Sequence, residues 1–295
     1  MKKQHSLLLG AHMSIASGIH LAIERGESIG CTAIQIFTKS NRQWKAKSLT
    51  NEEVDTFKNT WKQSSIQSVV THATYLLNIG SPDKDLEKKS VEALTMELER
   101  SASLDIPYLV LHPGSHSKTD EESCIERISN NLNKILKKVP HITILLETMA
   151  GQGTNVGYKF EHLAEIIKQS DFKRQLGVCF DTCHAFVAGY DFRTEKTYKT
   201  MWEQFDKIVG LNKLKAIHLN DSKTEIGSRV DRHTDIGKGK IGLKAFELLI
   251  NDPNFFDIPK ILETPKDDLS DDKRNMETMI KLLSRKTKTL LHYNE

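Results

Sequence analysis

Short runs of apolar residues recur along the chain, and most of them stop on a histidine or an acid. Seven runs, over residues 7–12, 69–72, 108–112, 142–147, 177–181, 216–218 and 260–263, end at His12, His72, His112, Glu147, Asp181, His218 and Glu263. A strand that is apolar throughout is typical of a parallel sheet buried on both faces. Because parallel strands point the same way, we expect their last residues to gather on one face.

Segments with apolar residues at helical spacing separate these runs. Such segments at 19–29, 50–61, 83–104, 121–139, 160–168, 197–209, 243–250 and 271–283, with a further strand at 33–37, give eight strands alternating with eight helices. Strict alternation predicts right-handed strand–helix–strand units and a parallel sheet. Eight such units in about 250 residues are typical of a TIM (β/α)8 barrel. A doubly wound open sheet is the alternative, but no Gly-x-Gly-x-x-Gly turn follows the first strand.

We therefore predict an α/β fold with a single TIM barrel over residues 1–285, a metal site at the C-terminal face of its strands, and a C-terminal tail at 286–295. The chain is 38% hydrophobic and 27% charged, as in ordinary globular proteins. It has no run near the about 20 apolar residues of a membrane span, and the apolar run after its basic start is too short for a signal peptide. We expect a cytoplasmic monomer with no membrane partner.

Charge and cysteine content exclude two simple interpretations. A net charge of +3 is too small to indicate nucleic-acid binding by itself, so any site for a polyanion must be a local patch. The four cysteines include no Cys-x-x-Cys pair, which favours reduced, packed thiols over a disulfide framework or a thiolate zinc site.

Nine acids and histidines form a candidate metal site: His72, His112, Glu147, Asp181, His184, His218, Asp231, His233 and Glu263. One ion takes about four ligands, so nine suggest two or three ions. Imidazole and carboxylate without thiolate suit zinc, manganese or iron better than calcium or magnesium. Three divalent ions carry more positive charge than four carboxylates cancel, so the site would keep a net positive charge. Such a site can stabilise the extra negative charge that develops when a phosphate ester is hydrolysed. His12 also ends a strand and can be a ligand or an outer hydrogen-bond partner.

Loops on the same face carry cations and apolar side chains. Residues 38–47 hold four cations and a tryptophan without an acid, Tyr75 and Leu76 closely follow His72, and residues 220–242 hold five more cations. A solvated basic loop would explain each alone, but their shared placement favours nucleic acid. The candidate DNA-binding residues are Lys39, Arg42, Lys45, Lys47, Tyr75, Leu76, Arg229 and Arg232.

These motifs resemble the endonuclease IV family of apurinic/apyrimidinic (AP) endonucleases, which are DNA repair enzymes. The resemblance runs from Gly10–Ser14 to Ile261–Pro265 and is strongest over 112–116, 178–184, 218–223 and 227–233. It implies three Zn²⁺ ions per chain. The first would be held by His72, His112 and Glu147, the second by Glu147, Asp181, His218 and Glu263, and the third by His184, Asp231 and His233.

The resemblance also implies the reaction, which is hydrolysis of the phosphodiester 5′ to an abasic site in double-stranded DNA, leaving a 3′-hydroxyl and a 5′-deoxyribose phosphate. Glu147 and Glu263 would be the catalytic residues, and Arg42, Tyr75 and Leu76 would insert into the DNA. Two alternatives stay open. One is a metal-dependent sugar isomerase or epimerase on a related barrel, which would need no cationic loops. The other is a non-catalytic zinc protein that binds DNA lesions.

Overall fold

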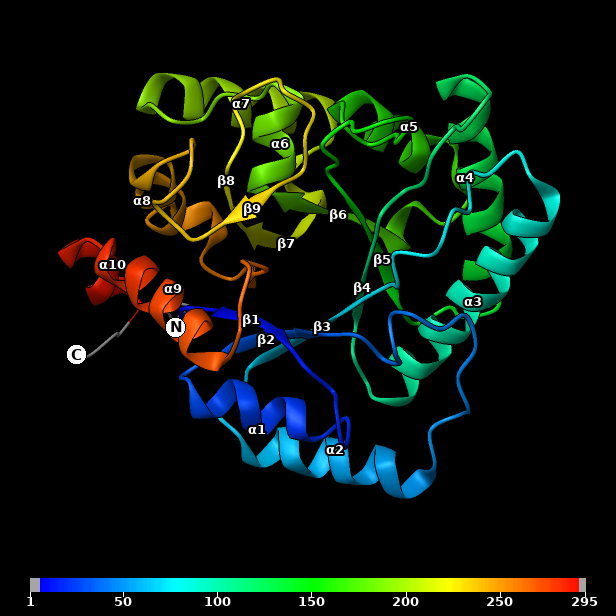
Figure 1. Ribbon diagram of the computed structural model, residues 1–295, viewed down its shortest axis with the longest axis horizontal. Helices are drawn as coiled ribbons and strands as arrows, with labels where there is room; N and C mark the ends of the chain where they lie inside the picture. Colours follow the sequence, from blue (N-terminus) through cyan, green and yellow to red (C-terminus); the bar gives the residue numbers. More distant parts are fainter. Residues whose placement is uncertain (1–5, 292–295) are drawn as a thin grey trace.

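Eight parallel strands pair edge to edge and close into a barrel in the computed structural model, which describes residues 6–291 (Figure 1). The strands follow the ring in the order β1, β2, β3, β4, β5, β6, β7, β10, and β10 returns to β1, where Leu9 lies opposite Lys260. Their bounds are β1 Leu9–Met13, β2 Ala33–Ile36, β3 Ser68–His72, β4 Tyr108–Leu111, β5 Thr143–Glu147, β6 Leu176–Asp181, β7 Leu214–Leu219 and β10 Lys260–Leu262. The predicted TIM barrel is confirmed.

The eight predicted helices surround the barrel, each between or after the expected strands (Figure 1). Their start signals are local: Thr50 accepts a hydrogen bond from the Glu53 amide while the Glu53 carboxylate accepts one from the Thr50 amide, a capping box. The helices are α1 Leu21–Ser28, α2 Asn51–Gln63, α3 Lys84–Ser103, α4 Glu121–Leu136, α5 Phe160–Gln169, α7 Glu195–Ile208, α8 Leu243–Ile250 and α9 Leu269–Lys281. Short 3₁₀ turns lie at Lys173–Gln175, Leu211–Lys213 and Pro253–Phe255.

Two further helices depart from the expectation. Helix α6, Thr182–Ala188, begins immediately after β6, where the sequence pattern predicted no helix. Helix α10, Arg285–Leu290, occupies the start of the expected tail 286–295. That part of the prediction is wrong, because Ser284 caps the helix through the Thr287 amide, and Thr287 and Leu291 are buried. Residues 292–295 lie outside the described residues.

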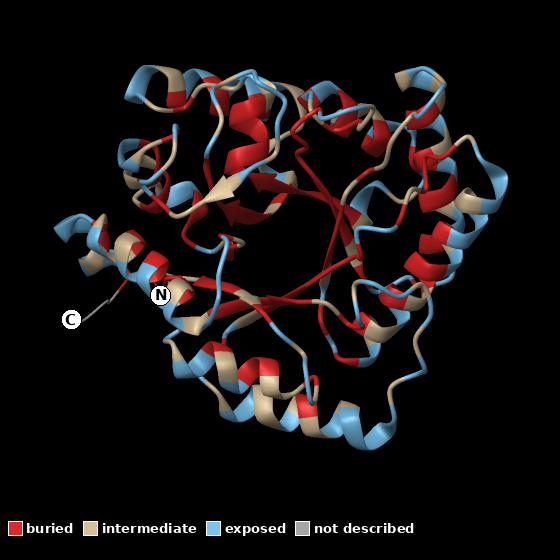
Figure 2. Ribbon diagram, viewed as in Figure 1, coloured by how far each residue is buried: buried red, intermediate tan, exposed pale blue. Residues whose placement is uncertain are grey.

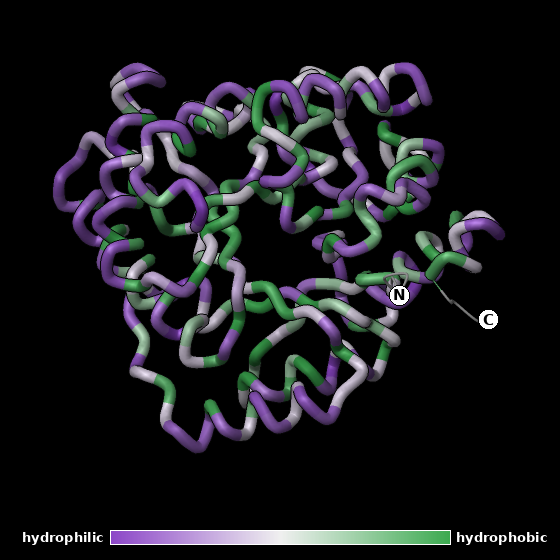
Figure 3. The backbone as a smooth tube through the Cα atoms, turned by 180° about the vertical axis from the view of Figure 1, so that it is seen from behind, coloured by the Kyte–Doolittle hydropathy of each residue, from purple (hydrophilic) through white to green (hydrophobic). Residues whose placement is uncertain are grey.

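Apolar side chains fill two layers, one between the strands and helices and one inside the barrel. Figure 2 shows burial concentrated on the strands and the inward faces of the helices, and Figure 3, seen from behind, shows the outermost turns of the trace as mainly hydrophilic. The inner layer consists of Val70, Val110, Leu145, Cys179 and Ala216. Each lies two positions before a candidate ligand, and alternate residues of a strand face the same side. The ligands therefore form the next layer, at the C-terminal mouth of the barrel.

Outside the barrel, a long loop between β7 and α8 contains the antiparallel pair β8 Asp221–Ser222 and β9 His233–Thr234. The buried Asp221 carboxylate shapes this loop by accepting hydrogen bonds from the amides of Gly237, Gly239 and Ile241 at 2.9–3.0 Å. Among residues 6–291, no helix has the length and apolarity that a bilayer crossing requires.

Candidate metal centre at the mouth of the barrel

The nine predicted ligands converge at the C-terminal mouth of the barrel. His72, Glu147, Asp181 and His218 lie on β3, β5, β6 and β7, while His112 and Glu263 directly follow β4 and β10. Four groups form in which one ligand atom per residue lies within 4.8 Å of the others: His72 with His112 and Glu147; Glu147 with Asp181, His218 and Glu263; Asp181 with His184 and His233; and Asp231 with His233 and Cys183.

Glu147 lies at the centre of these groups. Its Oε2 is 3.1 Å from Nε2 of both His72 and His112, and its Oε1 is 3.2 Å from Nδ1 of both His184 and His218. One fully buried carboxylate thus contacts four imidazoles. This arrangement is suited to a carboxylate that bridges two cations, as the resemblance implied.

His184 and His233 reach the site through local structure beyond the barrel strands. Asp181 Oδ1 accepts a hydrogen bond from the His184 amide at 2.8 Å and so caps α6, whose first turn places His184 over the barrel. His233 lies on β9, which β8 fixes by pairing Ser222 with His233. Asp231 joins both histidines, with its oxygens 3.1 Å from His184 Nε2 and 3.2 Å from His233 Nε2.

Charge complementarity holds the site together. Burial alone would raise the pKa of Glu147, but the surrounding histidines, His112 and His218 foremost, lower it well below its usual value. Burial likewise opposes protonation of His184, yet Asp181, Asp231 and Glu147 raise the pKa of this imidazole well above its usual value. The mouth is therefore a compact array of carboxylates and imidazoles, among which His184, His218 and His233 have a pKa well above the usual value, and a divalent cation can take the place of such imidazole protons.

The donor atoms fit a metal centre. The Nε2 atoms of His184 and His233 are buried and make no hydrogen bond to any described residue, although Asp231 lies close. The Nδ1 atoms of His72, His184 and His233 instead lie 2.6–3.2 Å from the backbone oxygens of Ala73, Thr148 and Glu263. An imidazole that hydrogen-bonds through one nitrogen and aims the other at a ligand cluster is typical of metal sites.

Several contributors were missed from the sequence. Cys183 groups with Asp231 and His233, although we expected only packed thiols; all four cysteines are buried and free. Asn220 donates to Asp181 Oδ2 at 2.7 Å and accepts from the Glu263 amide at 3.0 Å. Gln35 contacts His12, His218 and Glu263. The one feature of the sequence that could have indicated a role for Gln35 is that it is a polar residue inside an apolar strand.

The predicted wedge is exposed beside the ligands. Tyr75 and Leu76 have relative exposures of 57% and 36%. The Tyr75 ring lies 5.5 Å from the rings of both His72 and His112. Four of the predicted cations are also exposed on the neighbouring loops: Arg42, Lys45, Lys47 and Arg232. Arg229 is exposed too, with its guanidinium 4.6 Å from the Tyr158 ring centroid.

Lys39 corrects the sequence prediction. We expected it to contact DNA phosphates, but its relative exposure is 4% and its Nζ lies 3.0 Å from Glu97 Oε1 in a buried ion pair. Glu97 on α3 also accepts hydrogen bonds from the amide and hydroxyl of Thr74, at 3.0 and 3.1 Å. The charge of Lys39 is therefore neutralised inside the protein. Through Glu97, Lys39 connects the loop after β2 to the loop after β3.

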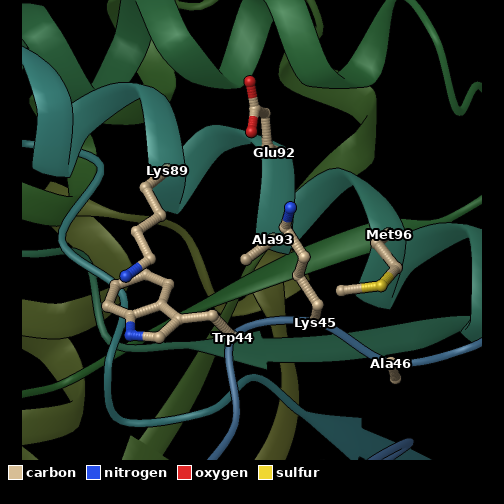
Figure 4. A pocket seen from close by; sticks show the side chains of 7 residues that line it. All are labelled: Trp44, Lys45, Ala46, Lys89, Glu92, Ala93 and Met96. Carbon is tan, nitrogen blue, oxygen red and sulfur yellow. The ribbon is translucent and has the colours of Figure 1, made fainter.

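A separate pocket of about 250 Å³ lies behind the loop after β2, against α3 (Figure 4). The Lys89 ammonium is 4.2 Å from the Trp44 ring centroid, and the lining residues are Trp44, Lys45, Ala46, Lys89, Glu92, Ala93 and Met96. Trp44 packs against the main core, so this contact anchors the cationic loop. Glu92 is the one metal-type ligand among these residues, and the pocket is distinct from the metal centre.

Comparisons with known proteins agree with this geometry. The model of a family described as xylose isomerase-like TIM barrel matches residues 23–286. The probable endonuclease 4 of Chloroflexus aurantiacus (strain ATCC 29366 / DSM 635 / J-10-fl) is 47% identical over 270 residues, which is 90% of this chain and 95% of that protein. The probable endonuclease 4 of Geobacter sulfurreducens is 46% identical over 282 residues, 95% of both chains.

Solved structures give the same result. The crystal structure of endonuclease IV from Thermus thermophilus matches with a TM-score of 0.83 and 36% identity, over 93% of this chain and 98% of that one. A D-tagatose 3-epimerase-like protein matches with a TM-score of 0.71 and 20% identity, over 94% of this chain and 97% of that one. The second likeness shows a shared fold only.

Proposed function

The chain belongs to the endonuclease IV family and is a nuclease, and from this premise we propose that it hydrolyses the phosphodiester 5′ to an abasic site in double-stranded DNA. Water would add to phosphorus while the bond from phosphorus to the upstream 3′-oxygen breaks, which leaves a 3′-hydroxyl and a 5′-deoxyribose phosphate. The observation that carries this proposal is one face with nine converging ligands and an exposed apolar wedge beside them.

We propose zinc as the cofactor, at three ions per chain. The donor set is five imidazoles and four carboxylates, which suits zinc. The first two groupings in the structure match the implied first and second sites, and Asp231 lies against both histidines of the implied third site. When bound, such ions supply positive charge for the phosphate and lower the pKa of a water molecule.

The two proposed catalytic carboxylates differ in access to solvent. Glu147 is fully buried, which suits a role in setting the spacing and charge of the centre, while the Glu263 side chain keeps 13% of its surface exposed. Glu263 therefore has room to accept a hydrogen bond from the attacking water and orient it toward phosphorus. Gln35 and His12 both lie near one carboxylate oxygen, with Gln35 Nε2 2.6 Å and His12 Nδ1 3.7 Å from Glu263 Oε1, whereas Oε2 faces His218.

The wedge and the exposed cations would provide recognition of damaged DNA. Arg42, Lys45, Lys47, Arg229 and Arg232 can bind backbone phosphates, which are read without regard to sequence. Tyr75 and Leu76 can fill the space in a duplex whose abasic sugar has turned outward, a distortion that costs less where no base is stacked. The cytoplasmic location and the monomeric state predicted from the sequence remain proposals.

A sugar epimerase is the weaker interpretation. The likeness to the D-tagatose 3-epimerase-like protein extends to the fold, at 20% identity. A small polyhydroxylated substrate would give no role to an exposed Tyr75–Leu76 wedge beside the ligands. A non-catalytic lesion binder does not agree with relatives that are named endonucleases.

The test is incision of a labelled duplex that carries one abasic analogue. We expect a single cut on the 5′ side of the lesion, no cut in the matched undamaged duplex, loss of cutting after incubation with a chelator, and recovery when zinc is restored. A cut on the 3′ side, or no cut by the zinc-loaded protein, would contradict the proposal.

A further inference from the structure

Gln35 is fully buried on β2 and joins three side chains of the metal centre from across the barrel. Its Nε2 lies 2.6 Å from Glu263 Oε1 and 3.0 Å from His12 Nδ1, and its Oε1 lies 2.8 Å from His218 Nε2. The amide N–H groups must face Glu263, because an ionised carboxylate only accepts hydrogen bonds. The amide oxygen therefore faces His218.

This orientation determines which nitrogen of His218 carries a proton. An amide oxygen only accepts, so His218 Nε2 must donate to it, and in the neutral imidazole Nδ1 is left with a free lone pair. That Nδ1 lies 3.2 Å from both Glu147 Oε1 and Glu263 Oε2, inside the second ligand group.

His218 differs in this respect from the other histidines of the centre. His72, His184 and His233 use backbone oxygens as outer partners for Nδ1, whereas His218 presents the opposite nitrogen to the centre and has a side chain as its outer partner. A backbone oxygen cannot be removed by substitution, but Gln35 can. The same amide also holds Glu263, a second ligand of the same group.

We propose that Gln35 is a positioning residue for the second metal ion, fixing the tautomer of His218 and the orientation of Glu263 with one amide group. The inference rests on the proposed zinc centre. Loss of an outer hydrogen-bond partner typically lowers metal affinity about 10- to 100-fold. Because Gln35 contacts ligands of the second group alone, that loss should fall on one of the three ions.

The experiment compares zinc release from the purified holoenzyme and from a Gln35→Met variant, which keeps the length of the side chain but removes its hydrogen bonds. Release is followed by competition with a chromophoric chelator, and Co²⁺ absorption reports the geometry of the reloaded sites. We expect one ion to bind about 10- to 100-fold more weakly and two to be unchanged. A Gln175→Met variant is the control, since Gln175 donates to the Ile142 backbone oxygen away from the mouth.

Unchanged affinity for all three ions in Gln35→Met would overturn the inference while the zinc centre stood. Equal weakening of all three ions, together with a lower melting temperature, would also overturn it, because Gln35 would then be only a packing residue. A wild-type protein that binds no zinc would refute the proposed function itself. Should Gln35→Met fail to fold, ¹⁵N spectra of the histidines in the wild-type holoenzyme decide the matter, since a His218 Nε2 without a proton contradicts the inference.

Discussion

Glu147 is the residue on which the proposed centre depends most, because four imidazoles share its two oxygens. We predict that Glu147→Gln lowers cleavage of abasic DNA by more than the about 100-fold that loss of an outer partner costs. The amide keeps the shape of the side chain but removes the charge that would join two ions. A barrel of this size should retain its fold, which circular dichroism and a melting curve can check. Cleavage near the wild-type rate would show that Glu147 does not bridge.

Lys260 is not among the proposed metal ligands, and its protonation gives a prediction about the stability of the protein. Its ammonium is fully buried and donates to the backbone oxygens of Phe255 and Ile258, and burial lowers its pKa to about 7. The unfolded chain has the ordinary lysine pKa of about 10.4, so between these values it binds a proton that the folded state lacks. The contribution of Lys260 to stability therefore becomes more favourable as the pH rises from about 7 to about 10.

Urea unfolding of the wild type and of Lys260→Met at several pH values tests this. We expect the free energy of unfolding of the wild type, relative to the variant, to rise by at most about 1.4 kcal/mol per pH unit over that range. The exposed Lys273 offers a matched control substitution, Lys273→Met, on the surface of the protein. A flat difference for Lys260→Met would mean that this ammonium keeps its ordinary pKa in the folded protein.

At this scale the sequence predicted which acids and histidines lie together better than it predicted the residues that contact them. Strand ends can be located from apolar runs, so the convergence of His72, Glu147 and Asp181 followed from the fold. Gln35 and Asn220 were missed because their importance depends on side chains from other strands. Lys39 was misassigned because its partner, Glu97, comes from a helix far along the chain, and the pairing of charges across a core cannot be read from local sequence.

Among the elements, α3 has an unexpected role, since it ties two loops of the mouth together. Glu97 holds Lys39 and Thr74, and Arg100 donates to the backbone oxygens of Thr38 and Lys47. We predict that Lys39→Met destabilises the protein by about 3–5 kcal/mol, because it leaves Glu97 as an unpaired buried charge. Chemical unfolding measures this loss.

Lys45 provides the matched comparison on the same loop. It is exposed, so Lys45→Met should change stability by less than about 0.5 kcal/mol. It should instead weaken binding to any duplex and make the salt dependence shallower by up to about one unit of slope. A large loss of stability in Lys45→Met, or none in Lys39→Met, would contradict this division between the two lysines.

The loop after β3 should distinguish damaged from intact DNA. We predict that Tyr75→Ala weakens binding to an abasic duplex by about 1–3 kcal/mol, roughly 5- to 150-fold in Kd, because an aromatic face that stacks in the gap is lost. Binding to an undamaged duplex and its salt slope should change little. Paired titrations at several salt concentrations measure both quantities.

Leu290, an exposed apolar residue on α10, is the control, and Leu290→Ala should affect neither duplex. Equal losses on damaged and intact DNA for Tyr75→Ala would make Tyr75 a packed loop residue, and the proposed damage recognition would then be wrong. The zinc content of the variant must also be measured, because the Tyr75 ring lies beside His72 and His112.

Most elements were predictable because their signals are local, as with the capped start of α2. The two helices that were not predicted, α6 and α10, lack such local sequence signals. Helix α6 has seven residues, all but its last buried, so no amphipathic pattern marks it, and α10 has six residues of mainly polar character. The pairing of β8 with β9 involves two residues from each strand and depends on the distant amides around Asp221.

For the whole molecule, we predict about three zinc ions per chain, because two groups of ligands share Glu147, and His184, His233 and Asp231 lie together as a third group. Elemental analysis of gently purified protein tests the number. Asp231→Asn should lower it to about two by weakening the third group, while Asp267→Asn, a change at an exposed acid, should leave it at three. Full activity with one ion per chain would refute the trinuclear centre.

The closure of the barrel by β10 also has a consequence in time. Leu9 pairs with Lys260, about 250 positions later in the chain. Because ribosomes add about 5–20 residues per second, β10 is synthesised about 10–50 s after β1, and until then β1 has only one of its two neighbouring strands. Strand β10 also pairs with β7, and Glu263 directly follows it. A chain still in synthesis therefore has neither a closed ring nor a complete set of ligands.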